Sequence, residues 1–216
     1  MLTLVIGDQN LSSWSLRPWM LLRHLGLDFE EVRLPLDTPS FRDEIGRYSP
    51  SRRVPVLLDG DLAIWDSLAI CEYLDEKTGG RAWPVEAAAR ARARSVSAEM
   101  HAGVAALRTA WTLRAAERGL DVPLSPTALA DVARIDEIWS TCRAGCAGHG
   151  PWLFGRYSIA DAMYAPVVLR FNTYGARLSH GAQGYFASTM QDAHLQEWIR
   201  GAEHELATAG RPSAHP

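Results

Sequence analysis

Residues 12–19 read SSWSLRPW and lie where one short sequence pattern gives way to another. Just before them, residues 3–6 form a β-rich run that ends at Gly7. Residues 14–25 then place apolar side chains at helical spacing, and Gly26 follows where glycine ends many helices. The stretch therefore joins a first strand to a first helix.

Pro18 and the serines before it bear on where this helix begins. Because proline lacks an amide hydrogen and is tolerated in the first turn of a helix, we predict a start at about residue 14 or 15, with Ser15 as the N-cap. Ser12 and Ser13 then lie just before the helix, near its positive end, where an anion is stabilised. A serine-rich start that only caps the helix is the alternative.

The alternation of strand and helix patterns continues through the first 80 residues. Strand patterns cover residues 29–34, 55–58 and 62–65, and helical patterns cover residues 41–48 and 67–78. Asp59-Gly60, between the last two strands, is a typical hairpin turn. This order indicates a small α/β domain with a mixed sheet.

After Gly80 the pattern becomes helical. Helical runs without strand-like alternation cover residues 86–118, 125–147, 159–172 and 192–208. We therefore predict an α/β domain in residues 1–80 and an all-α domain in residues 87–216, joined by a linker at about residues 79–86.

Composition and charge narrow the function classes. The 216 residues carry a formal net charge of −3, which argues against a protein dedicated to nucleic acid or to anionic membranes. No apolar run approaches the roughly 20 residues that cross a bilayer, and the N-terminus does not resemble a signal peptide, so we expect a cytoplasmic protein. The three cysteines, Cys71, Cys142 and Cys146, suggest neither a disulfide framework nor a metal site.

Two further motifs suit a small zwitterionic peptide. In residues 52–57, RRVPVL, a cis Val54-Pro55 bond would turn the Val54 backbone outward to pair with an extended ligand. In residues 65–70, WDSLAI, Asp66 and Ser67 begin a helix. They either cap that helix or bind a carboxylate at its N-terminus while Asp66 pairs with an ammonium group.

Together these motifs resemble the cytosolic glutathione S-transferase superfamily, and the resemblance covers nearly the whole chain. SSWSLRPW is similar to the family's Ser-type entry helix and close to the zeta-class motif S-S-C-x-x-R-V. SRRVPVL is similar to N-P-x-x-K/Q-V-P-x-L, and WDSLAI is similar to E/Q-S-x-A-I. The resemblance implies a thioredoxin-like domain before an all-helical one, glutathione as co-substrate and a two-fold homodimer.

The resemblance also implies roles for individual residues. It points to Ser12, or its neighbour Ser13, as the catalytic hydroxyl that holds the glutathione thiol as a thiolate. It assigns glutathione binding to Arg53, Val54, Pro55, Asp66 and Ser67. We expect the electrophile's pocket between the domains, lined by Trp14, Met100, His101, Ala105, Arg108 and Trp111. A structural role for His101 and an interdomain ion pair for Arg108 are the alternatives.

A further resemblance lies in the helical part. GPWLFGRYSIADAMYAPVV, residues 150–168, is similar to the family's stretch around its sixth helix. It implies that Ser158 and Asp161 form a buried capping box, which is a folding element and not a catalytic pair.

Three hypotheses for function remain. The first is a detoxifying glutathione transferase whose thiolate attacks a small hydrophobic electrophile. The second is a glutathione-dependent isomerase of an unsaturated diacid, like maleylacetoacetate isomerase; the serine motif supports it, and Trp14, at the position of the zeta-class cysteine, opposes it. The third is a non-catalytic scaffold on the same fold, which the intact glutathione motifs oppose.

Overall fold

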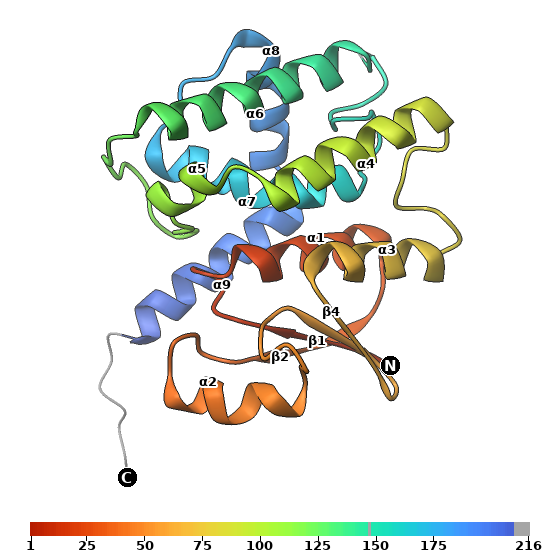
Figure 1. The fold of residues 1–216 in the computed structure, drawn as a ribbon, viewed down its shortest axis with the longest axis vertical. Helices are drawn as coiled ribbons and strands as arrows, with labels where there is room; N and C mark the ends of the chain where they lie inside the picture. The colour runs from red at the N-terminus through yellow and green to blue at the C-terminus, as the bar shows by residue number, and fades with distance from the viewer. Residues whose placement is uncertain (147, 210–216) are drawn as a thin grey trace.

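The computed structural model describes residues 1–146 and 148–209 and stacks the chain in two layers (Figure 1). A sheet and its helices form one layer, and the other is built from helices and the loops that connect them. An α/β part followed by an all-α part is what the sequence predicts. The last seven residues of the predicted region 87–216, residues 210–216, lie outside the described residues.

A four-stranded sheet in the order β2-β1-β3-β4 forms the centre of the first layer. Its strands are β1 (Leu2–Ile6), β2 (Phe29–Arg33), β3 (Val56–Asp59) and β4 (Leu62–Trp65). Strand β1 pairs parallel to β2 and antiparallel to β3, and β3 and β4 form the predicted hairpin, with Gly60 at a φ of 60°. The parallel pair requires a crossover connection, which a helix supplies.

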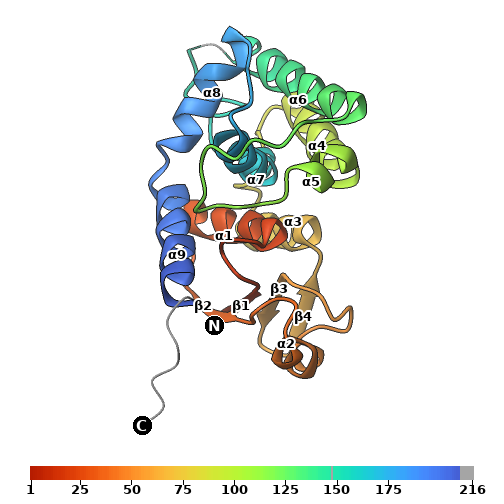
Figure 2. The same ribbon diagram turned by 90° about the vertical axis from the view of Figure 1, so that its left-hand side faces the viewer.

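Helices cover both faces of this sheet. The crossover helix α1 (Ser13–Leu25) and helix α3 (Ser67–Lys77) lie between the sheet and the helical layer. Helix α2 (Pro39–Glu44) and a 3₁₀ turn (Ile45–Arg47) lie on the opposite face (Figure 2).

The helical layer contains α4 (Ala87–Ala102), α5 (Ala105–Ala110), α6 (Pro126–Ala144), α7 (Ile159–Tyr174), α8 (His180–Met190) and α9 (Ala193–Ala209). Helix α9 runs along one side of the molecule, past α1, to the sheet edge at β2 (Figure 2). One hydrophobic core spans both layers, and α7 is buried over most of its length. Because burial of apolar surface is the main stabilising contribution in folding, the two layers pack as one unit.

The start of α1 differs from the prediction. The helix begins at Ser13 with Ser12 as its N-cap, so Ser15 lies inside the helix and the prediction of Ser15 as the cap was wrong. Pro18 then stands beyond the first turn, where it removes a hydrogen bond to the Trp14 carbonyl. Packing of α1 against both layers outweighs the loss of this one bond.

The helical run predicted for residues 86–118 is interrupted. Helix α4 ends at Ala102 and α5 begins at Ala105, because Val104 adopts a left-handed φ of 50°. Helix α8 was not predicted, and its Gly181 and Gly184 explain why, since glycine is a poor helix former.

Ser158 and Asp161 form the capping box at the start of α7, which confirms the prediction. The Asp161 carboxylate accepts hydrogen bonds from the N–H groups of Ser158 (2.8 Å) and Leu153 (2.9 Å). Burial raises the pKa of Asp161 to about 6, although these hydrogen bonds oppose the rise. The box therefore ties the preceding loop to the most buried helix of the fold.

Asp161→Asn should destabilise the fold. The asparagine side chain has the same volume, but its NH₂ group replaces one of the carboxylate oxygens that accept hydrogen bonds from backbone N–H groups. At least one buried N–H then loses its acceptor, which costs about 1–3 kcal/mol. The melting temperature, followed by circular dichroism, should fall by about 2–4 °C per kcal/mol lost. Asp61→Asn, at an exposed position, is the control. Equal melting temperatures for Asp161→Asn and wild type would contradict this role.

Candidate functional site

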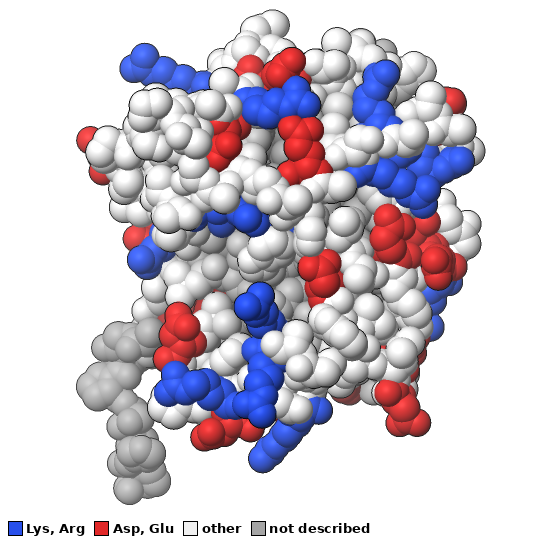
Figure 3. Space-filling view, viewed as in Figure 1, with Lys and Arg blue, Asp and Glu red and all other residues white. Residues whose placement is uncertain are grey.

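Two adjoining cavities open where the layers meet, on the face that Figure 3 shows. The sheet-side cavity has a volume of about 380 Å³, and the interdomain cavity has a volume of about 590 Å³. Trp14, Arg53 and Val54 line both of them, so a ligand can extend from one into the other. Lys and Arg side chains gather below them, over α2 and the neighbouring loops (Figure 3).

Ser12 lines the interdomain cavity at the N-terminus of α1 and is 5% exposed. Its Oγ accepts a long hydrogen bond from the Ser15 N–H (3.4 Å) and lies 2.7 Å from Ser15 Oγ. Ser15 Oγ in turn accepts a hydrogen bond from the Gly7 N–H (3.2 Å). Ser13 lines the same cavity. The helix end therefore presents two hydroxyl groups, and Ser12 belongs to a chain of hydrogen bonds.

The Val54-Pro55 bond stands at the boundary of the two cavities. It is cis, as the resemblance implies. The ladder between β1 and β3 includes Val56 but not Val54. The Val54 backbone therefore lies outside the strand register while its residue lines both cavities.

Asp66 and Ser67 line the sheet-side cavity at the start of α3. Asp66 Oδ1 caps the helix by accepting hydrogen bonds from the N–H groups of Leu68 (2.9 Å) and Ala69 (3.3 Å). Its other oxygen, Oδ2, lies 3.1 Å from Nε2 of His101. Asp66 also has a φ of 73°, a conformation that costs a non-glycine residue about 1–3 kcal/mol. The cap and the contact with His101 hold this carboxylate at the cavity wall.

Arg17 of α1 lies behind Ser67 and is fully buried. Its Nη1 donates to Ser67 Oγ (3.3 Å) and lies 3.5 Å from His101 Nδ1. Burial, followed by the charges of Arg170 and Arg108, lowers the pKa of Arg17 to about 9. Within the described part of the chain, its Nε and Nη2 have no hydrogen-bond partner. A poorly compensated positive charge therefore stands behind the sheet-side cavity.

His101 connects the helical layer to both of these groups. Burial lowers the pKa of His101, and Arg17 and Arg108 lower it further against the opposing effect of Asp66. A neutral ring protonated at Nε2 donates to Asp66 and accepts from Arg17 at Nδ1, which uses both nitrogens. His101 is thus a bridge between the layers.

Arg108 and Arg170 line the helical side of the interdomain cavity. Arg170 is 3% exposed and donates Nε–H to the Trp111 carbonyl (2.8 Å), and burial followed by the charge of Arg108 lowers its pKa to about 10. Nη1 of Arg108 is buried and has no partner among residues 1–146 and 148–209. The Trp14 ring centre lies 4.1 Å from the guanidinium carbon of Arg17 and 5.2 Å from that of Arg108. This side of the cavity is both aromatic and cationic.

The predicted pocket residues separate into two groups. Trp14, Ala105 and Arg108 line the interdomain cavity. The other three residues do not line it. Met100 is buried in the core, and Trp111 stacks on Tyr174 of α7. His101 contacts Asp66 instead. The break at Val104 gives α4 and α5 different directions, so residues 100–111 do not share one helix face.

Sequence reasoning missed several residues of the interdomain cavity, including Leu36, Phe41, Arg52, Leu113 and Arg170. Arg170 carried a usable signal, because it is a lone arginine in the otherwise apolar run of α7. The others lie in loops or on helices whose approach to the cavity is set by tertiary packing.

Comparisons with known proteins agree with this architecture. The family model for the glutathione S-transferase N-terminal domain matches residues 11–77, and the model for the C-terminal domain matches residues 86–201. The chain belongs to the glutathione S-transferase superfamily. Its thioredoxin-like sheet domain followed by a helical domain is the glutathione S-transferase fold, as predicted. No helix in the described part of this superfamily member is long and apolar enough to cross a membrane.

Among relatives of this glutathione S-transferase superfamily member, maleylacetoacetate isomerase of Rattus norvegicus is 28% identical over 173 residues, covering 77% of this chain and 76% of that protein. Dichloromethane dehalogenase of Methylophilus leisingeri is 43% identical over 56 residues, but that match covers 24% of this chain and 20% of the dehalogenase. A glutathione transferase homologue from Burkholderia, solved with bound glutathione, has a TM-score of 0.70 and 23% identity, covering 94% of this chain and 98% of that one. This last likeness shows the fold.

His101→Gln should remove a pH-dependent part of the stability. Because the folded state lowers the pKa of His101, it favours the neutral ring, and the associated stability is lost as pH falls below the unfolded value of about 6.5. The difference in unfolding free energy between wild type and His101→Gln should therefore shrink as pH falls from about 7.5 to about 5.5. Denaturant unfolding at a series of pH values measures it, and a constant difference would contradict the bridge.

Proposed function

We propose that the chain is a glutathione transferase that binds glutathione in the sheet-side cavity and uses Ser12 to hold its thiol as a thiolate. The thiolate then attacks an electrophile in the interdomain cavity. The observation that carries the proposal is the hydroxyl of Ser12 at the positive end of α1. It lies on the wall of the interdomain cavity, which shares Val54 with the sheet-side cavity that Asp66 lines. The glutathione transferase homologue from Burkholderia, which was solved with bound glutathione, supports it.

The hydrogen bonds of Ser12 suit a donor role. With Gly7 N–H donating to Ser15 Oγ and the Ser15 hydroxyl donating to Ser12 Oγ, the Ser12 hydrogen is free to donate to sulfur. Hydrogen bonds in such a chain polarise one another. The order of donors matters here, because the reverse order would turn the Ser12 hydrogen away from the thiol.

The required energy is within reach of these groups. An unperturbed thiol titrates near pH 8.5, and lowering its pKa by about two units needs about 2.7 kcal/mol. A hydrogen bond to a charged acceptor contributes about 1.5–3 kcal/mol, and a helix N-terminus contributes about 0.3–1 kcal/mol. Ser12 and the N-terminus of α1 together contribute about 1.8–4 kcal/mol, a range that includes the energy needed to hold the thiolate at neutral pH.

The sheet-side cavity offers a partner to each polar part of glutathione. In the proposed mode, the Val54 backbone, turned outward at the cis bond to Pro55, pairs with the cysteinyl unit, and Arg53 pairs with the glycine carboxylate. Asp66 Oδ2 takes the γ-glutamyl ammonium group, and Ser67 with the N-terminus of α3 takes the γ-glutamyl carboxylate. Their position along one connected pair of cavities supports this arrangement.

Ser12→Ala should slow conjugation of glutathione to a model aryl halide by about 3–25-fold at pH 7. A lost hydrogen bond of about 1.5–3 kcal/mol raises a thiol pKa of about 6.5 by one to two units, which lowers the thiolate fraction by that factor. The pKa of the bound thiol should rise by about one to two units, which the ultraviolet absorbance of the thiolate measures. Ser13→Ala, in the same cavity, is the matched control. If Ser13→Ala has the larger effect, Ser13 and not Ser12 holds the thiolate. If both variants keep the wild-type rate and thiol pKa, the assignment of a serine hydroxyl to this role is refuted.

A second candidate is a glutathione-dependent isomerase of an unsaturated diacid. The specific observation in its favour is the cationic wall made by Arg108 and Arg170. Nη1 of Arg108 is buried there without a partner among the described residues, and such a group suits a carboxylate. The relative in Rattus norvegicus is named maleylacetoacetate isomerase. This wall also disfavours a purely hydrophobic electrophile. Trp14, which stands where the zeta-class motif has cysteine, remains the argument against this candidate.

Arg108→Gln distinguishes these candidates. If a substrate carboxylate pairs with Arg108, kcat/KM for maleylacetoacetate should fall by about 10–100-fold, while turnover of an uncharged aryl halide should change by less than about threefold. Arg114→Gln, whose native side chain is exposed and pairs with Glu117, is the control. Equal losses on the two substrates would contradict a carboxylate contact at Arg108.

A non-catalytic scaffold is the weakest of the three hypotheses. A scaffold has no need of Ser12, Val54 and Asp66 along one pair of connected cavities. Failure of the protein to bind immobilised glutathione would favour it. The homodimer and the cytoplasmic location expected from the sequence stay predictions.

A further inference from the structure

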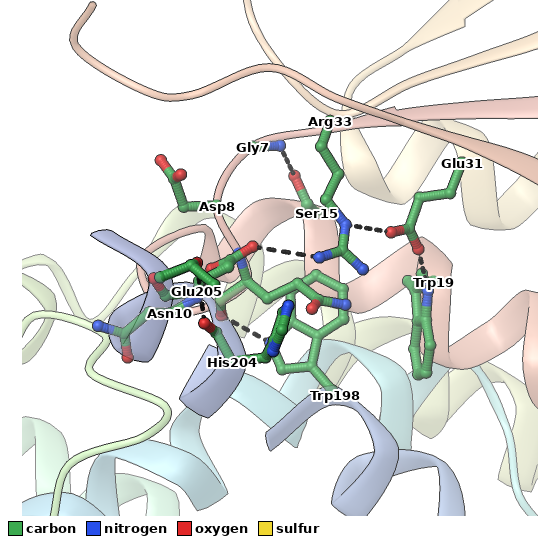
Figure 4. A network of polar contacts seen from close by, with 12 residues as sticks. Gly7, Asp8, Asn10, Ser15, Trp19, Glu31, Arg33, Trp198, His204 and Glu205 are labelled. Carbon is green, nitrogen blue, oxygen red and sulfur yellow. Dashed lines mark hydrogen bonds and ion pairs between the residues drawn. The ribbon is translucent and has the colours of Figure 1, made fainter. Parts of the chain in front are cut away.

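The segment of residues 8–12 leads from β1 into α1 and ends on Ser12, and α9, the last helix of the described residues, holds it (Figure 4). Glu205 of α9 accepts hydrogen bonds from two consecutive backbone N–H groups, at Oε1 from Gln9 (2.9 Å) and at Oε2 from Asn10 (3.0 Å). Trp198, about two turns earlier on α9, donates Nε1–H to the Gln9 carbonyl (2.8 Å). Helix α9 thus binds the peptide groups on both sides of Gln9.

The rest of the segment is held from other directions. Its own turn closes where the N–H groups of Leu11 and Ser12 donate to the Asp8 carbonyl. The Asn10 carbonyl accepts a hydrogen bond from the Ala115 N–H (3.1 Å) of the helical layer. The position of the segment therefore depends on elements far away in the sequence.

Close packing leaves α9 little freedom to shift against this segment. Gln9 is 3% exposed, and its side chain fills the space above Gly201, where a methyl group would overlap it. Trp198 is fully buried and meets Trp19 of α1 edge-on, with ring centres 5.2 Å apart. The same helix therefore contacts both the segment and the body of α1.

The Glu205 carboxylate is suited to orienting a peptide group. Its two oxygens bind two neighbouring N–H groups, and a two-pronged contact specifies direction as well as distance. The side chain is 21% exposed, and Arg33 Nη1 lies 3.5 Å from Oε1. Arg33 also pairs with Glu31, which accepts a hydrogen bond from Trp19 (2.8 Å), so the carboxylate is connected to β2 and α1 (Figure 4).

We propose that Glu205 is a positioning residue for the thiol-activating hydroxyl. By holding the peptide groups of Gln9 and Asn10, it directs the Ser12 hydroxyl toward the bound sulfur. This inference rests on the proposed function of Ser12, and it makes the C-terminal helix part of the machinery that sets thiol acidity in the N-terminal domain.

The test measures the pKa of glutathione's thiol in the complex, from thiolate absorbance over a pH series. Glu205→Gln replaces one acceptor with a donor that faces a backbone N–H, so it should raise this pKa by about one unit. From a value of about 6.5, such a rise lowers the thiolate fraction at pH 7 about threefold. kcat at pH 7 should fall about as much, with KM for glutathione within about threefold of wild type. Glu205→Asp, which keeps the charge on a shorter side chain, should recover part of the loss.

Glu203→Gln, an exposed position on the same helix, is the matched control and should behave as wild type. Ser12→Ala measured in parallel separates the two proposals. If Ser12→Ala raises the thiol pKa and Glu205→Gln does not, the positioning role is refuted while the proposed function stands. If Ser12→Ala has no effect, the positioning role of Glu205 for Ser12 is refuted as well, and if Ser13→Ala has none either, the proposed function itself fails. If Glu205→Gln folds poorly, Glu205→Asp provides the test instead. A lowered melting temperature of Glu205→Asp together with an unchanged thiol pKa would mean that Glu205 stabilises the fold without positioning Ser12.

Discussion

Helix α1 is packed on two sides, against the sheet and against α7, and the site depends on this double packing. Because neither side is free to move, the N-terminus of α1 is held at the boundary of the layers. Ser12 caps it there, on the wall of the interdomain cavity. The same packing places Arg17, one turn further on, behind Ser67 of α3. One buried helix therefore contributes to both cavities.

The burial of Arg17 is expensive for the fold. A guanidinium group away from water needs a partner for each N–H group, and burying it without them costs several kcal/mol. Ser67, His101 and the face of Trp14 offset part of this cost, but Nε and Nη2 have no partner within the described ranges. Such an uncompensated charge suits a place where an anionic ligand group arrives nearby. It therefore agrees with the proposed binding of a glutathione carboxylate at Ser67.

Those parts of the molecule that depend on local chemistry could be predicted from the sequence. The hairpin at Asp59-Gly60, the cap at Asp66 and the capping box of Ser158 and Asp161 all rest on interactions within a few residues, and all are present. The expectation of a cis Val54-Pro55 bond came from the resemblance to a family and is also met. Short-range motifs carry their own structural reason, so they can be recognised without knowing the fold.

Features set by tertiary packing could not be predicted in this way. Pro18 wrongly moved the expected start of α1 because the local rule ignores what the rest of the helix gains by burial. The contact between Gln9 and Glu205 joins residues 196 positions apart, and no periodicity near either residue indicates it. A serine motif can therefore name the hydroxyl that would face a thiol, but the direction of that hydroxyl is a property of the whole fold. It is settled where α9 meets the loop that follows the first strand.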